Sequence, residues 1–258
     1  FMFGGSGAYP GLDNGNALIG YSGFFLTNAA YDVSTSMFWF FQMVFAATTA
    51  TIVAGAMAER TRVTAYLAYS FLVTALIYPI YGHWMWGGGW LGGGGQLESW
   101  IGAAAVDFAG SGVVHTIGGM LALAGAATVG ARLGKYGPNG EVRTIKGHNM
   151  VYVVIGTFIL FFGWFGFNAG STVNGNDLRI SVIITNTFLA GATGAVTAAY
   201  VRLLQTGRIS AADTSNGALA GLVAVTAPCA FIAPWAAVVV GAIGALVMLT
   251  GIWFIDTK

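Results

Sequence analysis

Two ionisable side chains lie within one otherwise apolar stretch, DFAGSGVVHTIGG at residues 107–119. Asp107 opens the stretch and His115 follows eight residues later, so a helical rise of ~1.5 Å per residue places the imidazole about 12 Å further along. A carboxylate at a helix start caps free backbone N–H groups, and it can equally hold an outer cation site in shape. An imidazole deep in an apolar helix either bonds to a neighbouring helix or lines a pathway.

A second pattern combines aromatic rings with a hydroxyl group. Trp164, Phe167 and Ser171 are spaced i, i+3 and i+7, which places them within an arc of about 60° on a helix. Phe41 and Phe45 are spaced i, i+4 and also share a helix face. Ordinary aromatic packing explains each pattern. A group of aromatic faces with a hydroxyl also attracts a small cation through cation–π contacts, and composition alone does not choose between the two.

Other aromatic and polar side chains lie close to these patterns. Gln42 stands beside the face that carries Phe41 and Phe45. Trp84, Trp86 and Trp90 lie in a segment rich in glycine and tryptophan, HWMWGGGWLGGGG. Tryptophan is enriched where a membrane meets water, so these three residues are candidates for an interfacial belt as well as for a binding site.

Composition indicates the environment in which these residues act. Charged residues make up only 7% of the 258 residues and hydrophobic residues 56%, whereas about 25% of the residues of a soluble domain are charged. A soluble protein this apolar could not cover its surface with polar groups, so we expect a lipid bilayer around it. The ten Lys and Arg form no basic cluster, so we expect no nucleic-acid partner. The single Cys229 excludes an intrachain disulfide.

The uncharged stretches predict seven membrane-spanning helices, each of which takes roughly 20 apolar residues. Pro228 and Pro234 divide the last uncharged stretch into two spans. The predicted spans are 36–57, 63–83, 112–131, 150–171, 181–203, 216–231 and 235–255, with residues 1–4 as the end of an earlier helix. Cytoplasmic loops are rich in Lys and Arg. Nine of the ten Lys and Arg fall on one side of the alternating spans and only Arg179 on the other, which predicts the orientation.

The centre of these spans offers little to a charged molecule. No Asp, Glu, Lys or Arg lies deep in a predicted span, and burying a bare cation without a partner is very unfavourable. His115 lies near mid-depth of a hydrocarbon core that is ~30 Å thick. Neutral imidazole has one donor and one acceptor. A path through the helices would therefore suit a small neutral molecule that forms hydrogen bonds to imidazole.

Six motifs, taken together and in this order, resemble the ammonium transporter family (Amt/Mep/Rh). The resemblance covers nearly the whole chain, and Trp86 and Ser171 resemble the Amt/Mep branch rather than the Rh branch. The motifs are FQMVFAATTATIVAGAMAER (41–60), GHWMWGGGWL (82–91), DFAGSGVVHTIGG (107–119), GWFGFNAGS (163–171), TNTFLAGATGA (185–195) and GALAGLVAVTAPCA (217–230).

The resemblance implies a fold and an activity. The fold is an all-α polytopic membrane protein, an eleven-helix bundle with two inverted five-helix repeats that assembles as a homotrimer in the plasma membrane. On that map residues 1–258 form a single transmembrane transporter domain, with about seven complete helices and both ends truncated. The first helix and the last two would be missing. The implied activity is transport of ammonium or ammonia, with outer recruitment of NH4+, deprotonation, and passage through a hydrophobic pore.

The resemblance also assigns residues to the entrance of that pore. Phe45, Trp86 and Ser171 match the outer substrate-binding site that recruits ammonium. Phe45 and Phe167 match the stacked rings of the pore gate. Asp107 matches an aspartate that supports the recruiting site structurally.

Two further residues match the lining of the pore. His115 matches the first histidine of the family's pore pair, and Trp164 matches a pore-lining residue. The second pore histidine belongs to the tenth helix, and no residue matches it here, because His83 lies at an outer helix end and His148 at an inner one. We therefore expect that residues 1–258 alone do not complete a conducting pore.

Two other classes of function stay open. An ammonium-sensing membrane domain coupled to a cytoplasmic signalling module is the alternative, and a kinase or cyclase domain after Lys258 would distinguish it. A membrane enzyme that uses His115 as a base would need a second catalytic partner at matching depth, and the sequence offers none. We expect no enzymatic activity, no cofactor and no metal. The expected partners are ammonium or ammonia, lipid, further copies of the chain and a cytoplasmic PII-type regulator.

Overall fold

The computed structural model describes residues 17–20, 22–27 and 31–257. The helix end expected at residues 1–4, and the last cytoplasmic cation at Lys258, lie outside the described residues. The chain forms two compact units, and each is described by itself. The first comprises Phe1–Asp107 and Gly112–Leu133, and the second comprises Phe108–Ser111 and Gly134–Lys258.

The first unit contains two long helices and a third that starts with a wide turn. Its elements are η1 (Phe24–Leu26), α1 (Val33–Met57), α2 (Val63–Leu72), η3 (Val73–Ile77), α3 (Tyr78–Trp86), α4 (Gln96–Ile101), η4 (Ser111–Thr116) and α5 (Ile117–Val129). Both η3 and η4 are π-helical, a wide form that is rare and often occurs at functional sites. Helices α2, η3 and α3 join into one span, Val63–Trp86.

Helix α1 is capped at its outer end by Asp32. The carboxylate accepts hydrogen bonds from the Ser34 and Thr35 backbone N–H groups at 2.9 and 3.1 Å. Hydrogen bonds from the Thr35 hydroxyl, and then from its backbone, hold the pKa of Asp32 below its ordinary value. This cap explains why α1 starts three residues earlier than the predicted span 36–57.

Helices α1 and α5 pack closely because α5 presents glycine to α1. A Cβ at Gly118 would come within 2.8 Å of the Cβ of Ile52, so only glycine fits there without a shift. At the inner ends of both helices, Arg132 pairs with Glu59 at 2.8 Å. The two ends therefore lie on the same side, as the distribution of Lys and Arg predicts.

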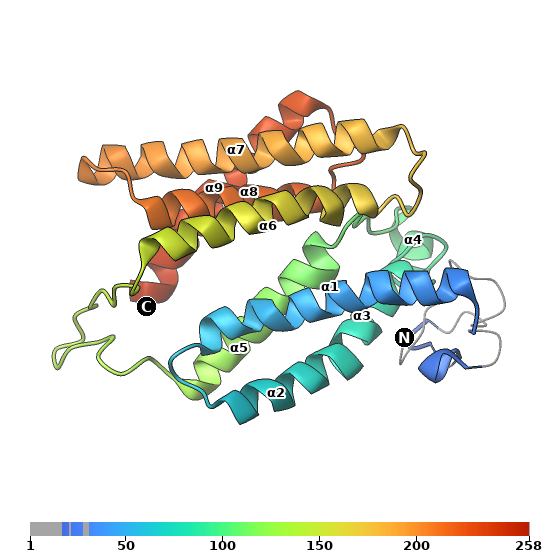
Figure 1. Cartoon of the computed structure of the whole chain (residues 1–258), viewed down its shortest axis with the longest axis horizontal. Helices are drawn as coiled ribbons and strands as arrows, with labels where there is room; N and C mark the ends of the chain where they lie inside the picture. Colours follow the sequence, from blue (N-terminus) through green and yellow to red (C-terminus); the bar gives the residue numbers. More distant parts are fainter. Residues whose placement is uncertain (1–16, 21, 28–30, 258) are drawn as a thin grey trace. The chain divides into compact units, whose positions relative to one another are not determined.

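The second unit consists of four helices, α6 (Met150–Gly170), α7 (Arg179–Thr206), α8 (Ala211–Thr226) and α9 (Pro234–Thr257). Helices α7, α8 and α9 pack against one another, and α6 packs against α7 and α8 (Figure 1). A Cβ on Gly221 of α8 or on Gly241 of α9 would overlap the carbonyl oxygen of Ala190 in α7. Glycine at these two positions lets the three backbones approach each other directly.

Within the residues that the structure describes, six helices are long and apolar enough to cross a membrane. They are Val33–Met57, Val63–Trp86, Ser111–Val129, Met150–Gly170, Arg179–Thr206 and Pro234–Asp256. Large apolar side chains on them stay exposed, as lipid contact requires; Phe158 and Phe162 of α6 are 71% and 79% exposed. The all-helical membrane fold expected from the sequence is confirmed.

The sixth predicted span, 216–231, has the expected length of 16 residues but lies five residues earlier in the chain. Helix α8 has 16 residues and ends at Thr226 instead of at 231. Ser210 caps its start by accepting from the Asp213 N–H at 3.2 Å. At its end the N–H of Ala227 donates to Ser111 Oγ at 2.7 Å, and the following Pro228 has no N–H to continue the helix. These hydrogen bonds, and not the pattern of apolar residues, determine where α8 begins and ends.

A glycine-to-alanine change at Gly221 tests the close packing of α8 on α7. The added Cβ would overlap the Ala190 carbonyl, so we expect the free energy of unfolding in detergent to fall by about 1–3 kcal/mol. Gly251 is the control, because a Cβ there meets no atom within 4 Å, and alanine favours the helix. Equal stability of Gly221→Ala and Gly251→Ala in denaturant titrations would contradict the close approach.

Candidate functional site

Asp107 caps the π-helical turn that carries His115. Its side chain is 7% exposed, and Oδ2 accepts from the backbone N–H groups of Gly112 and Val113 at 2.8 and 2.9 Å. The Asp107 carboxylate therefore acts as a helix cap, which is one of the two roles that the sequence allowed for it. The cap leaves little room, because a Cβ on Gly112 would come within 3.1 Å of the same oxygen.

Trp86, Asp107 and Phe45 come together in the first unit. The indole Nε1 of Trp86 donates to the backbone carbonyl of Asp107 at 2.6 Å. The ring of Trp86 meets Phe45 edge to face, with centroids 6.1 Å apart, and Phe45 is 2% exposed. Phe41 lies behind Phe45 at a centroid distance of 4.6 Å. The indole N–H is thus bound, and what remains for another molecule is the aromatic ring.

His115 lies in η4 (Ser111–Thr116), two residues after Val113, whose N–H the Asp107 carboxylate binds. Its side chain is half-buried, and it follows the buried residues Val113 and Val114. The cap and the wide turn together fix the backbone from which the imidazole projects. The pore-lining assignment of His115 stays a prediction.

Trp164 is anchored in the second unit by Thr226 of α8. The indole Nε1 donates to the Thr226 hydroxyl oxygen at 2.8 Å, and that hydroxyl donates in turn to the Leu222 carbonyl at 2.6 Å. Trp164 is 7% exposed and Thr226 is fully buried. Because the one donor of the indole is bound, the side chain presents only its apolar ring to its surroundings.

Phe167 and Ser171 continue the same face at the outer end of α6. The rings of Phe167 and Trp164 have centroids 5.8 Å apart. Ser171 follows the last helical residue and donates its hydroxyl proton to the Phe167 carbonyl at 2.8 Å. The lone pairs of the Ser171 oxygen then stay available to accept a hydrogen bond from another molecule.

The predicted site residues divide between the two units. The first unit holds Phe45, Trp86, Asp107 and His115, and the second holds Trp164, Phe167 and Ser171. The outer site of Phe45, Trp86 and Ser171 and the gate of Phe45 and Phe167 draw on both units, so both stay predictions. Within residues 17–20, 22–27 and 31–257, no three His, Cys, Asp or Glu side chains group as a metal ion requires.

Sequence reasoning missed two hydrogen-bonding side chains. Thr226 holds Trp164, and Tyr78 donates to Gln42 at 2.7 Å between α3 and α1. The sequence could have marked such side chains as candidates, because a hydroxyl or amide deep in an apolar span needs a hydrogen-bond partner. The sequence alone does not say which partner it takes.

Replacing Thr226 with Val tests the anchor of Trp164. The variant keeps the side-chain volume but leaves the buried indole N–H without its acceptor, so we expect a loss of about 1–3 kcal/mol in unfolding free energy in detergent. In a Trp164→Phe background the same change should have a smaller effect, because the donor is already gone.

Thr250→Val is the matched control for this experiment. The Thr250 hydroxyl bonds only to carbonyls of its own helix, those of Leu246 and Val247, and we expect a change below about 0.5 kcal/mol. Additive effects of Thr226→Val and Trp164→Phe would contradict the anchor.

Comparison with known proteins agrees with the motif pattern. Residues 1–258 match the family model described as Ammonium Transporter Family. The chain is 53% identical over 242 residues to ammonium transporter Amt2 of Archaeoglobus fulgidus, which covers 93% of this chain and 52% of that protein. It is 37% identical over 261 residues to putative ammonium transporter 1 member 5 of Arabidopsis thaliana, and the match covers 96% of this chain and 52% of that protein.

Solved structures show the same likeness. A protein titled Sensor Amt Protein superposes with a TM-score of 0.85 at 40% identity, covering all of this chain and 61% of that one. Mep2 of Candida albicans superposes with a TM-score of 0.78 at 34% identity, and the match covers 91% of this chain and 51% of that one. The chain spans about half the length of the relatives it matches. With a family model that covers every residue, this multi-pass membrane chain belongs to the ammonium transporter family.

Proposed function

We propose that the protein containing this sequence moves ammonium or ammonia across the plasma membrane. The observation that carries the proposal is the match of the whole chain to the ammonium transporter family. The local geometry supports it, because an aromatic pair with a bound indole N–H lies next to a capped turn that bears His115.

Outer recruitment of NH4+ is the first step of the proposed mechanism. The rings of Phe45 and Trp86 attract the cation through their negative faces. The Trp86 N–H would repel a cation, but it is directed to the Asp107 carbonyl. The Ser171 hydroxyl donates a hydrogen bond to the Phe167 carbonyl, so its oxygen accepts a hydrogen bond from an N–H group of the ammonium ion.

Deprotonation follows at the gate of Phe45 and Phe167, where the ammonium ion gives its proton to water on the outer side, because the path below the gate is apolar. A bare cation in an apolar path loses its hydration and finds no charged partner, whereas neutral ammonia loses far less. His115 offers ammonia one donor and one acceptor, while Trp164 contributes only its ring because Thr226 binds its N–H. A second histidine on the tenth helix of the full protein would complete the pore.

The remaining expectations belong to the same proposal. Residues 1–258 act as part of one transmembrane transporter domain, three copies of the protein form a homotrimer, and a PII-type regulator binds the cytoplasmic side. The protein catalyses no covalent chemistry. Named transporters among the relatives support transport as the activity.

A sensor is the second candidate function. The structure titled Sensor Amt Protein aligns with the whole chain at a TM-score of 0.85, so this membrane domain is also compatible with coupling to a signalling module. The sequence that follows Lys258 in the full gene product decides between them. A final transmembrane pair with a short tail favours transport alone, and a kinase or cyclase domain favours sensing.

Replacing His115 with Ala in the full protein tests the pore. We expect uptake of ammonium or methylammonium to fall about tenfold, or its selectivity to change, because ammonia loses a hydrogen-bonding partner in a dry path. His148→Ala is the control, since His148 is exposed at an inner helix end. Wild-type uptake and selectivity in a well-inserted His115→Ala protein would exclude the pore assignment.

Replacing Trp86 with Leu tests the outer site. Loss of the cation–π contact should raise the ammonium concentration for half-maximal uptake about fivefold to tenfold, with a smaller effect at saturating ammonium. Trp100→Leu serves as control, because Trp100 is 70% exposed. If the concentration dependence is the same in both variants and the wild type, Trp86 is only an interfacial residue.

A further inference from the structure

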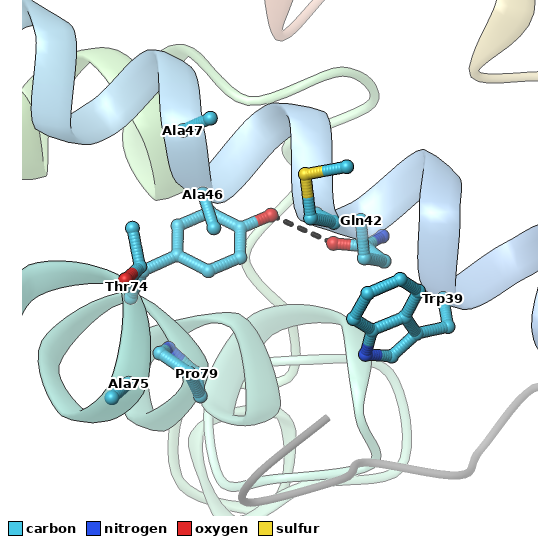
Figure 2. Close-up of a pocket in the computed structure, with 9 residues that line it drawn as sticks. Trp39, Gln42, Ala46, Ala47, Thr74, Ala75 and Pro79 are labelled. Atoms are coloured by element: carbon cyan, nitrogen blue, oxygen red, sulfur yellow. Dashed lines mark hydrogen bonds between the residues drawn. The ribbon is translucent and has the colours of Figure 1, made fainter. Parts of the chain in front are cut away.

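Gln42 and Tyr78 form a buried hydrogen bond between two helices of the first unit. The Tyr78 hydroxyl donates to Oε1 of Gln42 at 2.7 Å (Figure 2, dashed line). Tyr78 is 3% exposed and Gln42 is 8% exposed. Gln42 lies nine residues beyond Val33, the first residue of α1, which is about 14 Å at a rise of ~1.5 Å per residue. The bond is therefore formed in the apolar part of the span, where water does not compete for it.

The surroundings of this bond are loosely packed and almost entirely apolar. A cavity of about 380 Å³ separates the two helices there. Figure 2 shows Trp39, Ala46 and Ala47 of α1 on one side and Thr74, Ala75 and Pro79 on the other. The Thr74 hydroxyl donates to the Ser70 carbonyl of its own helix at 2.9 Å. Apolar contacts are not directional, so contacts around a cavity do not by themselves fix how one helix is rotated against the other.

The same two helices carry the aromatic pair of the proposed outer site. Gln42 precedes Phe45 by three residues, so both lie on the same side of α1. Tyr78 and Trp86 belong to the same short helix, α3. Phe45 and Trp86 touch edge to face with centroids 6.1 Å apart. Helices α1 and α3 thus meet at two levels, through the polar pair and through the aromatic pair.

Because the wide turn η3 (Val73–Ile77) lies between α2 and α3, the packing of α2 does not by itself determine how α3 is rotated about its own axis. Tyr78 is the first residue after this π-helical segment. A π-helical turn holds more residues than an α-helical one, so it changes the direction in which the residues after it point. Trp86 at the end of α3 is already tied to the Asp107 carbonyl, and a second directional contact at the start of α3 is needed to fix the rotation of the whole helix. A hydrogen bond supplies this, because it depends on angle as well as distance.

We propose that Gln42 and Tyr78 are positioning residues for the outer substrate site. Their hydrogen bond fixes the rotation of α3 against α1 and thereby holds the Trp86 ring at the edge of Phe45, where an ammonium ion is recruited. The inference rests on the proposed function of Phe45 and Trp86. Neither Gln42 nor Tyr78 touches the substrate.

The test uses the full protein in proteoliposomes, with Tyr78→Phe and Gln42→Leu as single variants. We expect each to raise the ammonium concentration for half-maximal uptake about threefold to tenfold, with little change in maximal rate. The preference for ammonium over methylammonium should change as well. Thr74→Val is the matched control, because it removes a hydroxyl from the same cavity without breaking the bond between the helices, and it should leave both quantities unchanged.

A double variant separates positioning from stability. Gln42→Leu combined with Tyr78→Phe leaves no buried polar group unpaired, so its thermal stability should return towards the wild-type value. Its half-saturation concentration should stay raised, because the directional contact is still absent. In a Trp86→Leu background, Tyr78→Phe should add no further increase, because the two changes act through one ring.

The outcomes distinguish the two proposals. If Trp86→Leu raises the half-saturation concentration but Tyr78→Phe, Gln42→Leu and their combination do not, the positioning proposal is wrong and the proposed function stands. If Trp86→Leu also has no effect, the outer site itself is wrong. Additive effects of Tyr78→Phe and Trp86→Leu would also overturn positioning through Trp86.

Discussion

A polar group inside the bilayer is stabilised by a partner within the protein, because hydrocarbon offers none. The arrangement of the chain follows from this constraint. Asp107 takes two backbone N–H groups at the start of a wide turn, and Thr226 takes the indole N–H of Trp164. Ser111 donates to the Val223 carbonyl and accepts from Ala227 where α8 ends. Each bond satisfies a group that would otherwise oppose insertion, and the bonds of Asp107 and Thr226 also help to place His115 and Trp164.

The same constraint determines what the candidate site can offer to a passing molecule. Two tryptophans have their only donor bound, Trp86 to a backbone carbonyl and Trp164 to a hydroxyl. Their rings remain, which suits a cation at the outer surface and a neutral molecule further in. The glycines of α5, α7, α8 and α9 allow the helices to approach closely.

Much of the fold could be predicted because lipid demands long apolar helices with charges at their ends. The predicted spans 63–83, 150–171 and 235–255 agree with the observed helices within a few residues. The span 216–231 was misplaced, because Ser210 and Ser111 set the ends of α8 through bonds that no local pattern reveals. The candidate residues of the site were found from motif resemblance, whereas Tyr78 and Thr226 were not. Their partners lie 36 and 62 positions away in the chain, and only the fold brings them together.

The hydrogen bonds Gln42–Tyr78 and Thr226–Trp164 join neutral groups, and the proposed transport of ammonium gives a physical reason for this. A carboxylate near the path would hold a cation by an attraction that is strong in a low dielectric, and a lysine or arginine would repel it. An amide and a phenol fix an angle without leaving a net charge. Gln42 with Tyr78 and Thr226 with Trp164 therefore set geometry with little electrostatic effect on the substrate, which in the proposed mechanism enters as NH4+ and crosses as ammonia. Asp107, a carboxylate close to Trp86, directs its charge into the backbone N–H groups of Gly112 and Val113.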